Sequence, residues 1–338
     1  MQLVKKYSDL PQSIAEEMKN ANVFFSEKYY NYSKNIGTMV WYAFDEQQIL
    51  AIDVHERICI KYAMYPSESY FIGGEKDAGK EKKFLNEVQD RLKQENISWV
   101  SSAATALFET YPNNSLRIPF GSHIIDLHMS EEEMWANIHS KHRNCIRRAE
   151  KNGVIIRRGG EELIHDYDLL DAETWARSNR TSYGEKFFKN IITNMKENAV
   201  IYIAYKDNIP QAGACYYVNK AMCYYMYGCS ADKTELGATN YMHWEAIKYF
   251  KKIGVEKYSF VGCRIEEDED SKYHSIQRFK ARFGGTLKQG YMFKTILNSR
   301  RYRLFRWMYK IKNKSQLTDA VDQEISKWQS LQDDSQKE

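Results

Sequence analysis

Residues 199–228, AVIYIAYKDNIPQAGACYYVNKAMCYYMYG, hold three strand-like runs that are separated by short polar turns. β-Branched and aromatic residues dominate each run, and such residues favour strands. The turn signals Asp207–Pro210 and Asn219–Lys220 are short enough to join neighbouring strands. The stretch therefore predicts an antiparallel meander. Its runs are Ala199–Tyr205, Gly213–Val218 and Ala221–Gly228.

A helix and a further strand follow this meander, and the same order occurs once before it. Helix signals run from Ala238 to Ile253 and stop at Gly254, before the strand-like Lys257–Gly262. We interpret the repeat as a tandem duplication of one α/β module, giving an α+β fold. The alternative is that such units are simply common in α+β proteins. The earlier copy comprises the runs Thr38–Phe44, Ile49–Val54 and Ile58–Tyr65, the helix Lys80–Gln94 and the strand Ile97–Ser101. This organisation predicts a first module at residues 1–120, a second at 121–299 and a basic helical tail at 300–338.

A sharply marked helix begins between the two copies. Ser130 and Glu133 form a capping box, and the acidic first turn suits the helix dipole. We expect Met134, Ile138, Cys145 and Ala149 to form its inward stripe, with a break near Ser140 and an end at Gly153.

Composition limits the function. The 338 residues carry 49 Lys+Arg against 45 Asp+Glu, and the net charge of +4 excludes a general polyanion binder. We find no signal peptide and no apolar run that could cross a bilayer, so a cytoplasmic location is expected. Six scattered cysteines are interpreted as small buried hydrophobes. The best metal-like cluster, His139, His142 and Cys145, has a spacing that does not suit zinc, so no metal is predicted.

Two local basic segments stand out. Residues 141–151 carry five Lys/Arg and one acid, which suits an anionic substrate, although a solvated helix face is the simpler interpretation. Residues 300–314 carry seven positive charges and no acid. The second segment suits peripheral contact with an anionic membrane, packing on the domain, or contact with the phosphates of an RNA stem. Its apolar face is predicted at Leu304, Met308 and Ile311, flanked by Phe305 and Trp307 and opposed by Arg303, Arg306 and Lys310.

Three blocks in register resemble the Fem family of peptidoglycan-bridge aminoacyltransferases and their GNAT-like relatives. The first is Met134–Val154, the second is Gly237–Lys248, and the third is the Arg-Phe-Lys segment at Ile276–Gly285. The resemblance covers about residues 130–294. It implies tandem GNAT-like modules, each a mixed, largely antiparallel sheet with flanking helices.

The resemblance also implies roles for individual residues. Lys280 would be catalytic, placing a cation beside the reacting ester. Arg177 and Tyr183 lie where family members hold the diphosphate of a nucleotide- or lipid-linked precursor, with Arg180 as an alternative to Arg177. The other substrate-binding candidates are Arg143, Arg147, Tyr225, Tyr227 and Arg278, and a cofactor would meet Gly237, Ala238, Thr239 and Asn240.

Two departures from the family pattern bear on activity and donor. The strand Tyr258–Gly262 has Ser259 where relatives often have Asp. The loop Ser230–Ala238 has one glycine, whereas a loop that binds the pyrophosphate of acyl-CoA usually has two. The resemblance therefore implies transfer of an aminoacyl group from aminoacyl-tRNA, rather than from acyl-CoA, onto an amine of a phosphate-bearing cell-envelope precursor. One alternative is an acyl-CoA-dependent N-acetyltransferase acting on a sugar amine or amino acid. The other is a non-catalytic membrane- or RNA-binding module.

Overall fold

A computed structural model describes residues 1–57, 59–265, 272–312 and 321–323. The strands are β1 (Gln2–Val4), β2 (Met39–Phe44), β3 (Gln48–Arg57), β4 (Ile60–Tyr65), β5 (Tyr70–Phe71), β6 (Ile97–Ser102), β7 (Leu116–Asp126), β8 (Ile155–Gly159), β9 (Ala199–Lys206), β10 (Ile209–Val218), β11 (Cys223–Ser230), β12 (Lys257–Ser259), β13 (Cys263–Arg264) and β14 (Thr286–Ile296). The α-helices are α1 (Gln12–Met18), α2 (Glu27–Asn35), α3 (Ala78–Gln94), α4 (Glu131–Asn137), α5 (Ser140–Lys151), α6 (Ile164–Ala176), α7 (Glu185–Met195), α8 (Ala238–Lys252), α9 (Lys272–Ala281) and α10 (Ser299–Lys312).

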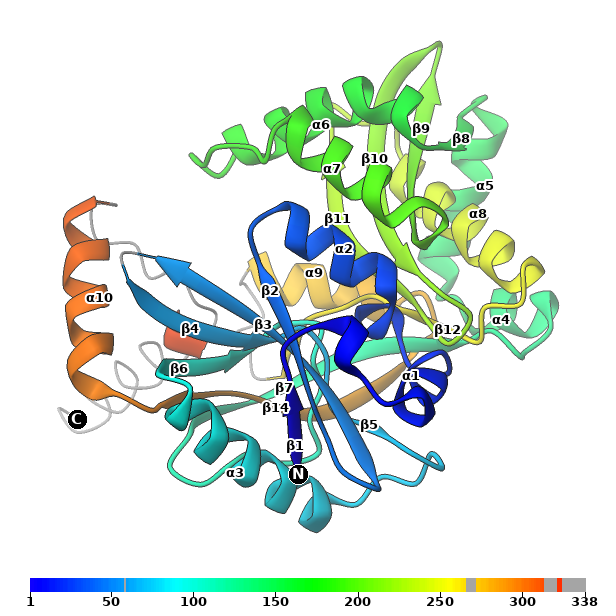
Figure 1. Cartoon of the computed structure of the whole chain (residues 1–338). Helices are drawn as coiled ribbons and strands as arrows, with labels where there is room; N and C mark the ends of the chain where they lie inside the picture. The colour runs from blue at the N-terminus through cyan, green and yellow to red at the C-terminus, as the bar shows by residue number, and fades with distance from the viewer. Residues whose placement is uncertain (58, 266–271, 313–320, 324–338) are drawn as a thin grey trace, which may run out of the picture.

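One continuous sheet runs through both halves of the molecule (Figure 1). Its strand order is β1-β2-β3-β4-β6-β14-β7-β12-β11-β10-β9-β8, with β5 against β3 and β13 against β7. In each half a meander is followed by a crossover helix, α3 or α8, and by a parallel strand, β6 beside β4 or β12 beside β11. Parallel neighbours need such a crossover. The predicted repeat of meander, helix and strand is therefore confirmed.

Strands β7 and β14 join the two halves. Strand β14 pairs with β6 through Lys294 and Ser101, and its other edge pairs with β7, which in turn pairs with β12. A strand that follows the second repeat in the chain thus lies against the first repeat in space. The predicted division at residues 120 and 299 stays a prediction.

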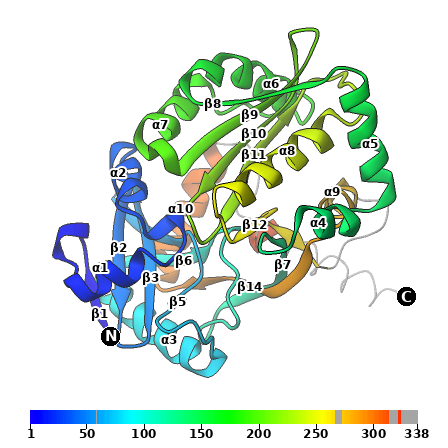
Figure 2. The same cartoon turned by 90° about the vertical axis from the view of Figure 1, so that its right-hand side faces the viewer.

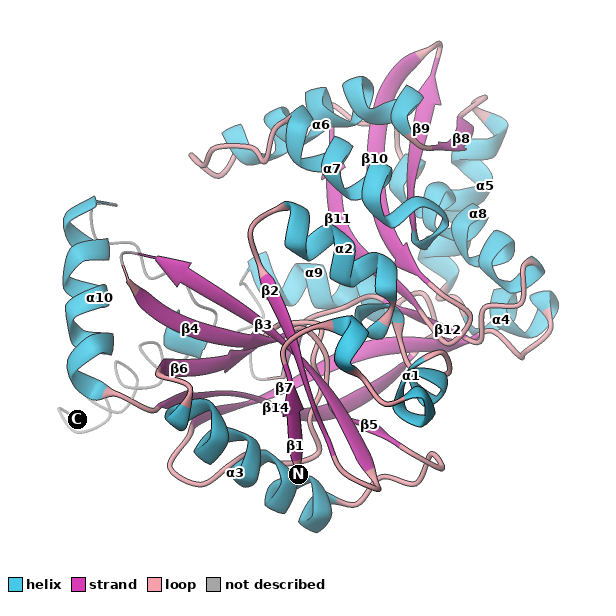
Figure 3. Ribbon diagram, in the orientation of Figure 1, coloured by secondary structure: helices cyan, strands magenta, loops and turns pink. Residues whose placement is uncertain are grey.

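Helices cover both faces of the sheet (Figure 3). In the second half, α6 and α7 pack on one face and α5 and α8 on the other, around two separate hydrophobic clusters. In the first half, α3 covers one face of β4 and β6, while α10 packs on the opposite face. Helix α2 lies beside α7 in both views, and Asn35 bonds to Asn194 there (Figures 1 and 2). The two halves therefore share a core.

The helix after Ser130 begins with the predicted capping box, and it is broken near Ser140, as predicted. The Glu133 amide donates to Ser130 Oγ at 3.1 Å, and the Ser130 amide donates to Glu133 Oε2 at 2.7 Å. The break falls between α4 and α5. Because α5 begins a new helical phase, Ile146 is buried and Cys145 is only half-buried, so the expectation that Cys145 lies in the inward stripe was wrong.

The predicted apolar face of the C-terminal basic segment also needs correction. Tyr302 is buried and Phe305 and Met308 pack with it, while Leu304 and Trp307 are 49% and 62% exposed. The inward face is chosen by aromatic partners on β4 and β6, such as Trp99 and Tyr62, rather than by hydropathy within the helix. The side chains of Lys310 and Ile311 lie outside the described residues, as do residues 313–320.

The cysteines are all unbridged, and four are buried as expected. Cys59 is exposed, against expectation, because it occupies the turn between β3 and β4 at φ +60°. No helix within the described residues combines the length and apolar composition that crossing a bilayer requires.

Candidate functional site

Lys280 lies near the C-terminal end of α9, with its ammonium group against a strained turn. Its Nζ donates to the carbonyl oxygen of Gly262 at 2.8 Å and also to that of Val261. Both residues have φ +49°, a conformation that a β-branched residue such as Val261 rarely adopts. Burial lowers the pKa of Lys280 to about 8, against a smaller raising effect of Cys263. A lysine ammonium has three N–H donors, so one remains for a ligand after these two carbonyls.

The turn at Val261 and Gly262 lies where the two halves of the molecule meet. A Cβ built on Gly262 would lie 3.6 Å from Ala104 and from Phe120 of β7, and Val261 packs against the core that both halves share. Nearby, β11 and β12 pair only at Cys223–Tyr258 and Tyr224–Ser259, after which β11 continues to Ser230. Lys280 therefore sits beside the point where two parallel strands diverge.

A cluster of aromatic rings surrounds His243, which lies close enough to Lys280 to be affected by its charge. His243 is completely buried, and its Nδ1 lies 2.9 Å from the Tyr216 hydroxyl and 2.8 Å from the Tyr258 hydroxyl. Burial lowers the pKa of His243 to about 3, and the charge of Lys280 adds to this shift. His243 is thus neutral and shielded from solvent, which suits a structural role rather than that of a general base.

His139, His142 and Cys145, whose spacing was considered for a metal site, each interact with a different part of the protein. His139 caps α5, since its Nδ1 accepts from the Lys141 amide at 3.2 Å. His142 Nε2 lies 3.0 Å from the carbonyl oxygen of Phe279, and burial lowers its pKa to about 4. Cys145 faces α8 through its backbone. These three residues have separate structural roles.

The structure brings three of the predicted substrate residues together at the outer end of β11. The ring centroid of Tyr183 lies 5.3 Å from that of Tyr227. Arg177 reaches the same strand end, where its Nη2 donates to the Ser230 carbonyl at 3.0 Å and to Ser230 Oγ at 2.9 Å. Arg177 and Tyr183 remain exposed, so this cluster is open to a ligand.

Tyr225 does not join that cluster, although it is two residues from Tyr227. Their partners in β10 are the consecutive Tyr216 and Cys215, so Met226 is an extra residue in a β-bulge. The bulge sends Tyr225 toward α8, where its ring lies 4.5 Å from that of His243, and sends Tyr227 toward α6 and α7. Sequence alternation alone would have put both tyrosines on one face.

The three other basic candidates lie on α5 and α9. Arg143 Nη1 donates to the carbonyls of Ala136 at 2.9 Å and Ile138 at 2.6 Å, which completes the C-terminal end of α4. Arg147 is exposed, with its guanidinium 5.3 Å from the ring centroid of Trp135. Arg278 is exposed on α9. Arg143 is therefore held by backbone oxygens, whereas Arg147 and Arg278 present their charge to solvent.

The predicted cofactor residues lie at the start of α8, against α5. Gly237 has φ +87°, and a Cβ built there would lie 2.1 Å from the carbonyl oxygen of Cys145. Ala238 and Asn240 are buried, and Thr239 is half-buried. The backbone of α5 therefore covers this helix start closely.

Backbone amides of the loop before α8 already have acceptors within the protein. A pyrophosphate bound there would have to replace these acceptors, and it would lie beside the Glu173 carboxylate. The amides of Ser230, Asp232 and Glu235 donate to Thr174 Oγ1, Glu173 Oε2 and Gln211 Oε1, each at 2.8 Å.

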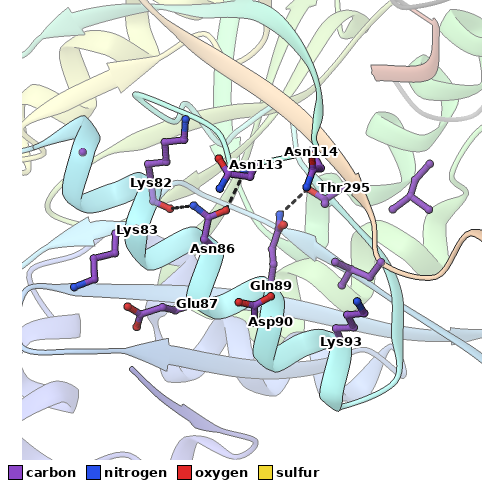
Figure 4. Close-up of a pocket in the computed structure, with 13 residues that line it drawn as sticks. Lys82, Lys83, Asn86, Glu87, Gln89, Asp90, Lys93, Asn113, Asn114 and Thr295 are labelled. Atoms are coloured by element: carbon purple, nitrogen blue, oxygen red, sulfur yellow. Dashed lines mark hydrogen bonds between the residues drawn. The ribbon is translucent and has the colours of Figure 1, made fainter.

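A pocket of about 680 Å³ lies elsewhere, along α3 (Figure 4). Lys82, Lys83 and Lys93 line it, together with the side-chain amides of Asn86 and Gln89, which have hydrogen-bond partners within the protein. Asn86 accepts from the Asn113 amide at 2.9 Å, for example. None of the predicted site residues lines this pocket, and we assign no function to it.

Comparison with solved structures agrees with the fold described above. The structure superposes on a crystal structure of FemX with a TM-score of 0.68 and 15% identity, over 90% of this chain and 99% of that one. A structure of L-PGS from Bacillus licheniformis gives a TM-score of 0.55 at 10% identity, over 87% and 95% of the two chains. The predicted α+β fold of two repeated modules, each a mixed, largely antiparallel sheet with flanking helices, is thus confirmed.

Sequence comparison identifies the family. The FemAB family model matches residues 113–208 and 205–310, and the chain belongs to the FemAB family. The aminoacyltransferase FemB of Staphylococcus epidermidis is 31% identical over 106 residues, which is 30% of this chain and 25% of that protein. The match thus spans about a quarter of the curated relatives' length.

Proposed function

We propose that the chain is an aminoacyltransferase that transfers an aminoacyl group from aminoacyl-tRNA to an amine of a peptidoglycan precursor. The observation that carries this proposal is the position of Lys280 beside the diverging strands β11 and β12, where two of its three N–H donors bind carbonyl oxygens of the described residues. Membership of the FemAB family and the similarity to FemB support the same reaction class.

The proposed reaction is an aminolysis. A neutral amine of the acceptor attacks the ester carbonyl of the donor, a C–N bond forms, and the C–O bond to the tRNA ribose breaks. The ribose oxygen leaves with the proton that the amine loses. Negative charge develops on the carbonyl oxygen during attack, and the Lys280 ammonium would stabilise it.

The acceptor would be a nucleotide- or lipid-linked precursor that carries phosphate. Arg177, beside Tyr183 and Tyr227, supports a phosphate position at the end of β11, because a guanidinium can contact two phosphate oxygens. Arg147 and Arg278 are exposed cations that stay candidates for the same substrate. Arg143 would act only indirectly, by holding α4.

The engaged loop before α8 supports aminoacyl-tRNA over acyl-CoA as the donor. The side chains of Glu173 and Gln211 accept hydrogen bonds from backbone amides of this loop, and a bound pyrophosphate would need those amides as donors. The proposed location is the cytoplasm, at the inner face of the membrane, with peripheral contact through residues 300–314.

A donor assay tests the proposal. The full chain is incubated with a soluble nucleotide-linked muropeptide and with either radiolabelled aminoacyl-tRNAs or labelled acetyl-CoA. Label should reach the muropeptide only from tRNA. Transfer from acetyl-CoA would support the N-acetyltransferase alternative. An absence of transfer from every donor would overturn the proposal and favour a non-catalytic module.

A further inference from the structure

Helix α10 presents an apolar and basic face to solvent. Leu304 is 49% exposed and Trp307 is 62% exposed, and these two large apolar side chains lie one helical turn apart. At about 100° per residue, Arg300, Arg303, Leu304 and Trp307 fall within roughly 100° of the helix circumference. We refer to these four residues as the outer face of α10.

The opposite side of α10 fixes the helix to the protein. Phe305 packs 4.7 Å from the ring centroid of Trp99, and Tyr302 lies 5.3 Å from the same ring. Arg306 extends over Tyr302, and Arg301 donates to the Asn96 carbonyl at 3.4 Å. The outer face is therefore held in a fixed orientation by contacts that do not involve its own side chains.

Charge on this helix has one sign. The sequence from Ser299 to Lys312 contains six Lys/Arg and no acidic residue. Within the described part of the chain, neither Arg300 nor Arg303 forms an ion pair with a carboxylate. The outer face thus combines uncompensated positive charge with exposed apolar groups.

We propose that the outer face of α10 docks on anionic phospholipid headgroups. Tryptophan is favoured at the membrane interface, and arginine is attracted by an anionic leaflet. Leu304 favours a lipid surface over RNA, because an aliphatic side chain gains from burial below headgroups but offers no ring for stacking on bases.

This lipid contact deepens the proposed function and rests on it for its purpose, which is to bring the Lys280 site to a lipid-linked acceptor. The binding itself is independent of catalysis. It can therefore be measured without donor or acceptor, and failure of one does not imply failure of the other.

The test compares binding of the full chain to two kinds of vesicle. One is phosphatidylcholine alone, and the other contains about a quarter phosphatidylglycerol, which supplies the anionic surface. Co-sedimentation of the wild-type chain should occur with the anionic vesicles and should weaken with salt, because salt screens the attraction.

Three variants locate the contact. Arg300→Glu with Arg303→Glu should lower the partition coefficient at least about tenfold, given the strength of each basic contact. Leu304→Ser with Trp307→Ser should lower it by a similar factor without changing the net charge. The matched control is Lys83→Glu with Lys93→Glu on α3, which changes the net charge equally at two exposed sites.

The outcomes separate the possibilities. Loss of binding in both α10 variants, with the control and the transfer to the soluble muropeptide unchanged, supports the contact. Equal loss in the α3 control would overturn it, because binding would then follow net charge alone. Binding to tRNA but not to anionic vesicles would overturn it in favour of an RNA surface.

Discussion

The ammonium of Lys280 lies 2.8 Å from the carbonyl oxygen of Gly262, on a turn whose two residues both have left-handed backbone conformation. The turn directs two carbonyl oxygens at one lysine. This arrangement orients the side chain and, among the described residues, leaves the third N–H donor of the ammonium without an assigned acceptor.

Removing the charge of Lys280 should lower turnover more than stability. In Lys280→Met we expect kcat to fall at least about 100-fold, the size of effect seen when an oxyanion donor is lost. The free energy of unfolding should change by no more than about 1–3 kcal/mol, because removal of a buried charge offsets the loss of the donor to two carbonyls. Steady-state kinetics and urea unfolding measure the two effects.

A matched control is available in α8. Lys251 Nζ also donates to a backbone carbonyl, that of Leu127, at 3.1 Å. Lys251→Met should destabilise the protein mildly while turnover stays close to the wild-type value. Turnover near normal in Lys280→Met would contradict the role of Lys280.

The pH profile should reveal the same ammonium. Burial lowers the pKa of Lys280 to about 8, so the charged form disappears as pH rises through that value. We expect kcat to decline above about pH 8 and the decline to be absent in Lys280→Arg, because arginine stays protonated. A wild-type alkaline decline that persists unchanged in Lys280→Arg would exclude Lys280 as its source.

The lowered pKa of Lys280 should also make the stability of the protein depend on pH. Between about pH 8 and the ordinary pKa of 10.5, the unfolded chain binds more protons at this lysine than the folded chain does. The contribution of Lys280 to stability should therefore rise with pH across that window, and Lys280→Met should lack this rise in urea unfolding.

Gly237→Ala should destabilise the contact between α5 and α8. The added Cβ would lie 2.1 Å from the Cys145 carbonyl oxygen, and φ is +87°. We expect a loss of about 3 kcal/mol or more in the free energy of unfolding, since steric overlap adds to backbone strain. Gly254→Ala is the matched control, because φ is +79° there and no atom lies within 4 Å of the added Cβ.

The control should lose only about 1–2 kcal/mol, from backbone strain alone. Equal losses in the two variants, measured by urea unfolding, would show that α5 can move away from α8. That result would also mean that the N-terminal end of α8 can be uncovered to bind a pyrophosphate.

Asp53 should make the protein less stable as pH rises. This carboxyl is buried in β3, and Oδ2 accepts from the Tyr29 hydroxyl at 2.6 Å. Burial raises its pKa to about 7, against a lowering effect of that hydrogen bond. Because the folded state binds the proton more tightly, the stabilising contribution of Asp53 is present below about pH 4 and is lost as pH rises to about 7.

Asp53→Asn should remove this dependence. At pH 8 we expect the variant to be about 1–3 kcal/mol more stable than the wild type, because a neutral amide replaces a buried charge. At pH 4 the difference should be small. Urea unfolding at the two pH values measures it, and equal differences at both would contradict the assignment.

Local pattern predicted much of the architecture. The meander at residues 199–228, the helix after Gly237 and the capping box at Ser130 depend on residues close together in sequence, and all three form. The block around Lys280 led to the family in the same way. Tyr225 and Tyr227 were predicted to bind substrate together, but one extra residue in β11 interrupts the regular alternation and separates them.

The sequence by itself determined the repeated module, the start of α4 and the residues of the FemAB blocks, because spacing, capping and strand alternation act over short distances. Only the tertiary structure decided that β14 pairs with β6, that Lys280 meets the carbonyls of Val261 and Gly262, and that α10 turns Trp307 outward. These outcomes depend on which residues, far apart in the sequence, bury one another or pair their backbones in the folded chain. The aromatic partners of α10 on β4 and β6 come together only once the chain has folded.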